Sequence, residues 1–155
     1  HEVYPTIISE LTKNRENYIW DFYTSPQELG VKRMEAMETF LDDYELGSRQ
    51  NRYVTGELPE LDISNDRFEI ALCSHFLFTY CYHFDVEFHV SSLLELLRIA
   101  SQVRVFPLRA IDAKEVLFLN EVIERLEASG YDCKKVKVSY AFQKEADEML
   151  VIDRS

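Results

Sequence analysis

The sequence predicts an α/β protein: a Rossmann-like, mainly parallel sheet covered by helices, with an antiparallel pair of strands at the carboxyl terminus. Short apolar segments alternate with longer amphipathic ones, which is the pattern of strand–helix–strand crossover units. The last two apolar segments are instead joined by a short connection, residues 142–147, which favours antiparallel neighbours. A content of 46% hydrophobic residues, with only 4 Gly and 4 Pro, is typical of a packed globular protein.

Two helices are predicted in the first third of the chain. Pro5 suits the first position of a helix, and the apolar residues after it recur at helical spacing, which predicts a helix over residues 6–20. Thr24-Ser25-Pro26 is a helix-start signal, and an apolar face continues from it over about 20 residues. Gly47 is expected to end this second helix.

The rest of the chain alternates between predicted strands and helices. Pro107 stops one of the strands, and Gly130 closes the last helix. We read the whole as a single, incomplete domain over residues 1–155. The predicted strands are 52–55, 68–73, 103–108, 135–140 and 148–152, and the further helices are 86–101 and 115–128.

Charge and cysteine content exclude several classes of protein. A formal net charge of −11 argues against binding to nucleic acid or to an anionic membrane surface, since both need clustered Lys and Arg. The 3 cysteines are odd in number and have no Cys-x-x-Cys spacing, which favours reduced thiols over disulfides. No signal peptide and no apolar run of about 18 residues is visible, so a cytoplasmic protein is expected.

The stretch Asp66–Tyr80 carries the strongest functional signal. A turn leads into the apolar strand, which then breaks at Cys73-Ser74-His75. In open α/β sheets ligands bind outside the carboxyl ends of strands, so this polar break marks a candidate site. His75 is the candidate general base, because its ordinary pKa lies near neutrality; the alternative is a histidine that caps the sheet by bonding backbone.

The middle of the chain resembles a bacterial group of class I S-adenosylmethionine-dependent methyltransferases. The resemblance rests on Gly56-Glu57-Leu58-Pro59-Glu60-Leu61 followed by Phe68-Glu69-Ile70-Ala71-Leu72-Cys73-Ser74-His75-Phe76-Leu77-Phe78. Residues 14–23, 95–100 and 103–108 are similar as well, so the likeness runs over nearly the whole chain. It implies that the chain corresponds to the carboxyl-terminal two-thirds of the methyltransferase fold.

The resemblance also implies roles for individual residues. Glu57, with the backbone amide of Leu58, would face the adenine of S-adenosylmethionine, and Ser74 would line the cofactor cleft. His75 would stand beside the methyl donor and the acceptor. Arg15 and Tyr80 are candidate substrate contacts, against the alternatives of structural polar contacts for Arg15 and simple packing for Tyr80.

The sequence departs from the family where the amino-acid part of the cofactor would bind. No Gly-x-Gly occurs, and the four glycines are isolated. The acidic ribose-binding residue would lie at or before His1, for which Glu2 is a weak substitute. Without the family's first strand, strand 68–73 would be an exposed edge, which predicts either a fragment of a longer protein or self-association through that edge.

Other reactive side chains have simpler interpretations. Cys73 follows a buried apolar strand and is expected to be a core residue rather than a nucleophile. The spacings of His75, His83 and His89 match no strong metal-ligand pattern, so no metal is predicted.

Two functions from different classes follow. The first is methyl transfer from S-adenosylmethionine to an unidentified acceptor, with this chain alone inactive. The alternative is a methyltransferase-like interaction domain, degenerate or truncated, that binds no cofactor. A third candidate, another nucleotide-binding Rossmann enzyme, is disfavoured by the antiparallel closing pair.

Overall fold

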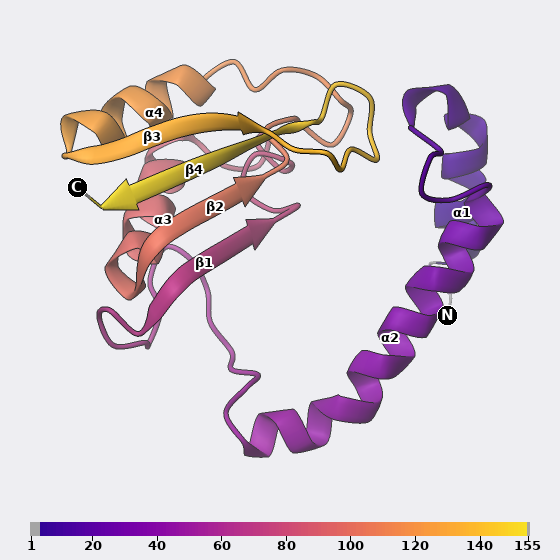
Figure 1. Ribbon diagram of the computed structural model, residues 1–155, viewed down its shortest axis with the longest axis horizontal. Helices are drawn as coiled ribbons and strands as arrows, with labels where there is room; N and C mark the ends of the chain where they lie inside the picture. The colour runs from indigo at the N-terminus through magenta and orange to yellow at the C-terminus, as the bar shows by residue number, and fades with distance from the viewer. Residues whose placement is uncertain (1–3, 155) are drawn as a thin grey trace. The chain divides into compact units, whose positions relative to one another are not determined.

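A computed structural model describes residues 4–154, which divide into two compact units (Figure 1). The helical unit comprises the described residues up to Thr55 together with Phe142–Lys144. The sheet unit comprises Gly56–Ala141 and the described residues from Glu145 onward. That the chain forms a single domain stays a prediction.

The helical unit contains two helices joined by an aromatic turn. Helix α1 spans Tyr4–Lys13, a 3₁₀ turn follows at Arg15–Asn17, and α2 spans Pro26–Arg49. The first predicted helix, 6–20, is therefore too long, because the chain leaves the helix to pack its aromatic residues. Tyr18, Trp20 and Tyr23 contact the ring of Phe142, and the Ile19 N–H donates to the Phe142 carbonyl at 2.7 Å.

The predicted start of the second helix is confirmed, but its predicted end is wrong. Ser25 caps α2 by accepting a hydrogen bond from the Glu28 N–H at 3.1 Å, with Pro26 in the first turn. Gly47 lies inside the helix, where a Cβ would come within 2.2 Å of the Tyr53 ring. Gly47 therefore permits a close approach of Tyr53 and does not act as a cap.

The predicted strand over residues 52–55 is wrong. Instead, Arg52 and Tyr53 fold back onto α2 and bind the Asp43 carboxylate. Arg52 donates two hydrogen bonds, at 2.6 and 2.7 Å, and the Tyr53 hydroxyl donates a third at 2.7 Å. These bonds, from Arg52 first and then Tyr53, lower the pKa of Asp43 to about 2.

The sheet unit is built on four strands in the order β1-β2-β4-β3. β1 and β2 pair in parallel, whereas β4 is antiparallel to both of its neighbours, so it alone runs against the others. The predicted α/β class and the antiparallel closing pair are confirmed; the finer Rossmann-like assignment stays a prediction. The strands are β1 Phe68–Ser74, β2 Ala100–Phe106, β3 Tyr131–Lys137 and β4 Glu148–Arg154.

Two helices cover one face of this sheet. α3 spans Val86–Ile99 and runs directly into β2, and α4 spans Leu119–Ala128, a shorter helix than the predicted 115–128 (Figure 1). Both contribute to one apolar core with every second residue of the inner strands. No helix of the described sheet unit lies on the opposite face. The core includes Leu93, Leu97, Val103, Val105, Val122, Leu126, Leu150 and Ile152.

His89 is a polar side chain at the centre of this core. Its Nδ1 lies 2.7 Å from the Asp85 carbonyl oxygen, and its Nε2 lies 3.1 Å from the Leu77 carbonyl oxygen. The ring is fully buried and stacks on Phe78 at 5.3 Å between centroids. His89 thereby links α3 to the segment that follows β1, because its two ring nitrogens lie within hydrogen-bond distance of a carbonyl oxygen on either side.

An ion pair on α3 holds the loop that enters β1. Glu95 accepts a hydrogen bond from the Leu61 N–H at 2.6 Å and from Arg98 at 2.7 Å. Arg98 in turn donates to the carbonyl oxygens of Ile63 at 2.7 Å and Leu61 at 3.0 Å. The hydrogen bond from Arg98, together with that from the Leu61 N–H, lowers the pKa of Glu95 against the opposing effect of burial.

We expect Glu95→Gln to destabilise the sheet unit by about 1 to 3 kcal/mol at neutral pH. Because the pKa of Glu95 is lower in the folded protein, this stabilisation is present above the ordinary pKa of glutamate and is lost as pH falls through the folded value. In urea unfolding at several pH values, the free energies of unfolding of the wild type and the variant should therefore converge in acid. Glu124→Gln, on the exposed side of α4, is the control; a difference that persists unchanged in acid would contradict the prediction.

Candidate functional site

The carboxyl ends of β1 and β2 meet at the predicted site. Ser74 lies opposite Phe106 in the parallel register, and the His75 N–H donates to the Phe106 carbonyl at 2.8 Å. The backbone bond extends the pairing one residue past the strand, so both strands end together. This is the edge of an α/β sheet at which ligands generally bind.

His75 has an unusual backbone conformation for its residue type. Its φ of 53° lies in the left-handed region, which costs energy for residues other than glycine. Its Nδ1 lies 2.8 Å from the Ser74 hydroxyl, and its ring contacts Phe106 edge-on at 5.7 Å. Strained residues often occur at functional sites, and a hydroxyl this close to an imidazole can pass a proton to it.

The main chain and the side chain of His75 therefore have separate roles. Its backbone N–H caps the sheet, as the alternative interpretation expects, but the imidazole is exposed beside the Ser74 hydroxyl. The role of His75 as general base stays a prediction.

Cys73 lies on the other face of β1, in the core. Its side chain is buried, and this burial raises the pKa of the thiol. A thiol that stays protonated in apolar surroundings is a poor nucleophile. This environment agrees with the prediction that Cys73 is a packing residue.

Glu57 and Leu58 lie in a tight turn before β1. The Glu60 N–H donates to the Glu57 carbonyl at 3.2 Å around the cis Leu58–Pro59 bond. Glu57 is exposed and Leu58 is half-buried. The next residues, from Leu61, are held by the last turns of α3, which leads into the amino end of β2, and none of the contacts described for residues 4–154 joins Glu57 to Ser74.

Arg15 and Tyr80, the predicted substrate contacts, occupy different settings. Arg15 donates to the Thr24 carbonyl at 3.2 Å, and its guanidinium lies 5.0 Å from the Trp20 ring centroid. The Trp20 indole donates to the Arg15 carbonyl at 2.9 Å, so Arg15 has the structural contacts of its alternative interpretation. Tyr80 is exposed in the segment after β1, with its ring near His83.

A cavity of about 280 Å³ lies in the sheet unit, and the sequence did not predict it. The side chain of Arg109, just after β2, is only 20% exposed and lies 3.5 Å from Glu115 and 3.6 Å from Glu145. In the sequence, the only sign of this cavity is a charged residue, Arg109, that closely follows the end of a predicted strand. The lining residues are Leu108, Arg109, Glu115, Val116, Leu117, Leu119, Asn120, Lys135 and Glu148.

The cavity in the sheet unit combines both signs of charge with apolar walls. Arg109 and Lys135 are cationic, Glu115 and Glu148 are anionic, and the remaining lining is mostly aliphatic. Such a lining suits a small polar molecule better than an apolar one. Ser74 and His75 are not among its lining residues, so it is a separate hollow in the same unit.

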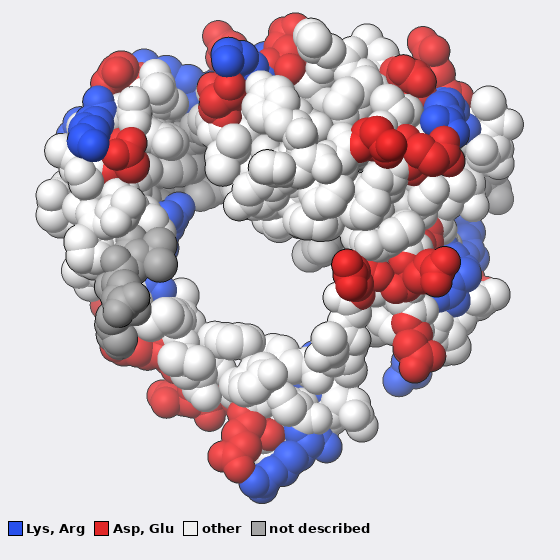
Figure 2. All heavy atoms as spheres, turned by 180° about the vertical axis from the view of Figure 1, so that it is seen from behind, with Lys and Arg blue, Asp and Glu red and all other residues white. Residues whose placement is uncertain are grey.

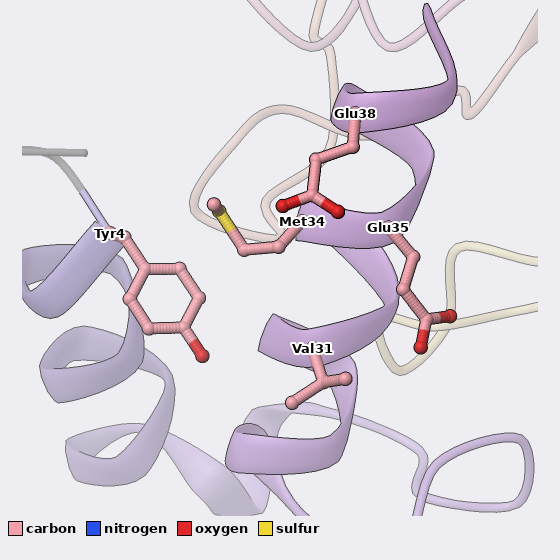
Figure 3. A pocket seen from close by; sticks show the side chains of 5 residues that line it. All are labelled: Tyr4, Val31, Met34, Glu35 and Glu38. Atoms are coloured by element: carbon pink, nitrogen blue, oxygen red, sulfur yellow. The ribbon is translucent and has the colours of Figure 1, made fainter.

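A second cavity, of about 440 Å³, lies between α1 and α2 in the helical unit (Figure 3). Tyr4 faces it from α1, and Val31, Met34, Glu35 and Glu38 line it from α2. The Glu35 carboxylate points away from Tyr4 in Figure 3 and accepts a hydrogen bond from Lys32 at 2.8 Å. This apolar hollow contains no nucleophile paired with a base.

The surface is predominantly acidic. On the face shown in Figure 2, the basic side chains form small groups, mostly beside acidic ones, with no continuous basic patch among the described residues there. Among residues 4–154, no three His, Cys, Asp or Glu side chains are placed to hold a metal ion. None of the described helices is both long and apolar enough to span a bilayer.

The strain at His75 leads to a test of the site's backbone. We expect His75→Val to destabilise the protein by about 1 to 2 kcal/mol, since a β-branched residue tolerates the left-handed region poorly. His75→Asn should be nearly neutral. The control is His83→Val, because His83 is exposed and its φ is not positive. If urea unfolding shows the same loss of stability for both valine variants, backbone strain at His75 is ruled out.

Comparisons with known proteins give one relative and no activity. No protein-family model matches the chain, and no solved structure matches it. The chain is 28% identical over 140 residues to an uncharacterized protein of Methanocaldococcus jannaschii. The match covers 90% of this chain and 60% of that protein, so the chain spans less than two thirds of its relative's length.

Proposed function

We propose that this chain serves methyl transfer from S-adenosylmethionine to an acceptor that is not yet identified. The observation that carries the proposal is the Ser74–His75 pair at the joined ends of β1 and β2. A hydroxyl and an imidazole stand there within 2.8 Å, at the position where the sequence resembles methyltransferases. In this proposal His75 accepts the proton of the acceptor's nucleophile, and Ser74, Glu57 and Leu58 contact the cofactor.

The arrangement of the sheet lends further support. The antiparallel closing pair expected from the resemblance is present, and β1 has the edge position expected when the family's first strand is missing. Chemistry of this kind depends mainly on aligning a nucleophile with the donor methyl group. A rigid strand end with a strained residue is suited to such alignment.

The described residues do not by themselves enclose the cofactor. Neither of the two cavities above is lined by Glu57, Leu58 or Ser74, and Ser74 is exposed. The described residues therefore do not form a complete binding site for S-adenosylmethionine. The proposal is accordingly that this chain supplies one wall of the site and that further polypeptide supplies the other.

Titration calorimetry with S-adenosylmethionine and S-adenosylhomocysteine tests the proposal. We expect binding to the full-length gene product, weakened at least ~10-fold by Glu57→Gln, because a carboxylate contact is lost. Glu60→Gln, in the same exposed turn, is the matched control. His75→Ala should leave binding intact and slow methyl transfer. Absence of binding to the full-length product would refute the proposal.

The second candidate is an interaction domain that binds no cofactor. One observation favours it: the apolar residues of β1 are exposed along the open edge of the sheet. Such surfaces mark contact sites with other polypeptides. Calorimetry separates the two candidates, since a non-catalytic domain would bind neither form of the cofactor.

A further inference from the structure

Two neighbouring side chains on β3 and β4 carry opposite charges that do not pair with each other. Lys135 lies opposite Leu150 in the antiparallel register, and Glu148 comes two residues before Leu150. Side chains two residues apart share a face of a strand, so both lie on the helix-covered side, where Leu150 is buried. Such diagonal neighbours are about 7–8 Å apart, which two long side chains can bridge. Among residues 4–154, however, neither Lys135 nor Glu148 forms an ion pair.

The other lysines of β3 already have partners. Lys134 pairs with an aspartate of its own strand, and the Lys137 ammonium lies 3.1 Å from the Asp147 carboxylate. Lys137 is the residue directly opposite Glu148 in the register, but its charge is offset by Asp147 instead. Lys135 and Glu148 are therefore left for a partner from outside the described residues.

Both of these charges line the polar cavity of the sheet unit. The wall beside them is apolar and includes Leu108, Val116 and Leu119. Leu108 and Val116 are buried, so this wall is fixed by the packing of the core. The cavity volume of about 280 Å³ lies just below the range of sites for drug-sized ligands, so the cavity suits only a small molecule.

The loop side of the cavity is preformed. Arg109 lies 3.5 Å from Glu115 and 3.6 Å from Glu145, so its charge is offset within the protein. Arg109 and Glu115 also pair as an isolated β-bridge, and the Ala110 N–H donates to the Lys114 carbonyl at 3.0 Å. These bonds shape the loop before any ligand arrives. A preorganised wall lowers the entropic cost of binding.

We propose that this cavity binds a free aliphatic α-amino acid in its zwitterionic form. Lys135 pairs with the carboxylate of the ligand, Glu148 pairs with its ammonium group, and its side chain packs against Leu108 and Val116. One small molecule with two adjacent charges thus bridges two diagonal neighbours that do not contact each other. The residues of the candidate methyl-transfer site do not line the cavity, so this inference is independent of the proposed function.

The charges of the cavity favour a zwitterion over a simple ion. An anion alone would leave Glu148 without a partner and would be repelled by the net charge of −11. An amine alone would leave Lys135 without a partner. A charge that loses water without gaining a partner weakens binding, so a ligand with both charges is preferred. A peptide terminus carries only one of the two charges, which favours a free amino acid.

Matched ligands test the pairing of charges. We expect L-leucine to bind the full-length gene product in titrations followed by NMR, with chemical-shift changes at the residues that line the cavity. Isocaproate, which lacks the ammonium group, and isoamylamine, which lacks the carboxylate, should each bind at least ~10-fold more weakly. Absence of L-leucine binding, or an analogue that binds as tightly as L-leucine, would overturn the inference. This comparison needs no variant protein.

Variants assign each charge of the ligand to its partner. Glu148→Gln should weaken L-leucine binding at least ~10-fold and remove the preference for L-leucine over isocaproate, because the ammonium group has lost its partner. Lys135→Met should likewise remove the preference over isoamylamine. Lys134→Met and Glu124→Gln, at exposed positions outside the lining, are the controls. Circular dichroism checks that all variants are folded; preferences that persist in the cavity variants, or that the controls also lose, would contradict the assignment.

Titration with S-adenosylmethionine on the same protein separates this inference from the proposed function. L-leucine binding without cofactor binding would support the inference and refute the proposed function. Cofactor binding without L-leucine binding would have the opposite meaning.

Discussion

The parallel pairing of β1 with β2 is the interaction on which the candidate site depends. β1 has a neighbour on one side only, so its position is set by the bonds to β2 and by the core beneath it. The pairing continues through the bond between the His75 N–H and the Phe106 carbonyl. His75, at the end of this pairing, has a φ in the left-handed region, and its Nδ1 lies 2.8 Å from the Ser74 hydroxyl.

Polar side chains on α3 hold the segments that precede and follow β1, and His89 is the fully buried one among them. His89 reaches the Leu77 carbonyl just beyond the site, and Glu95 with Arg98 holds the loop that enters β1. One helix thus holds the chain on both sides of β1. Because an unsatisfied buried polar group is costly, the contacts of the fully buried His89 specify the path of the backbone more sharply than apolar contacts alone.

Local patterns predicted some elements well and others poorly. The strand at 68–73 was found because a continuous apolar run ends in polar residues, and it spans Phe68–Ser74 in the structure. The third strand of the sheet, predicted at 135–140, begins at Tyr131 instead. Its first half does alternate, with Tyr131 and Cys133 half-buried and Asp132 and Lys134 exposed, but two apolar residues are too few to mark a strand.

Errors arose where distant residues decide the structure. Arg52 and Tyr53 read as a strand locally, but their bonds to Asp43 on the preceding helix override that tendency. The polar cavity combines residues after β2, from α4 and from two antiparallel strands, a set that no local pattern brings together. Of the candidate site, the Ser74–His75 step was predictable because both residues are adjacent in the chain; the contacts of Arg15 were not.

The direct passage from α3 into β2 has a consequence for how this protein can vary. Ile99 ends the helix and Ala100 begins the strand, so nothing can be inserted there without shifting a buried register. The connections at the opposite end of these strands, residues 75–85 and 107–118, are long by comparison. Insertions are tolerated mainly in such loops. New specificities would therefore evolve by lengthening the loops beside His75, while the amino ends of the strands stay constant.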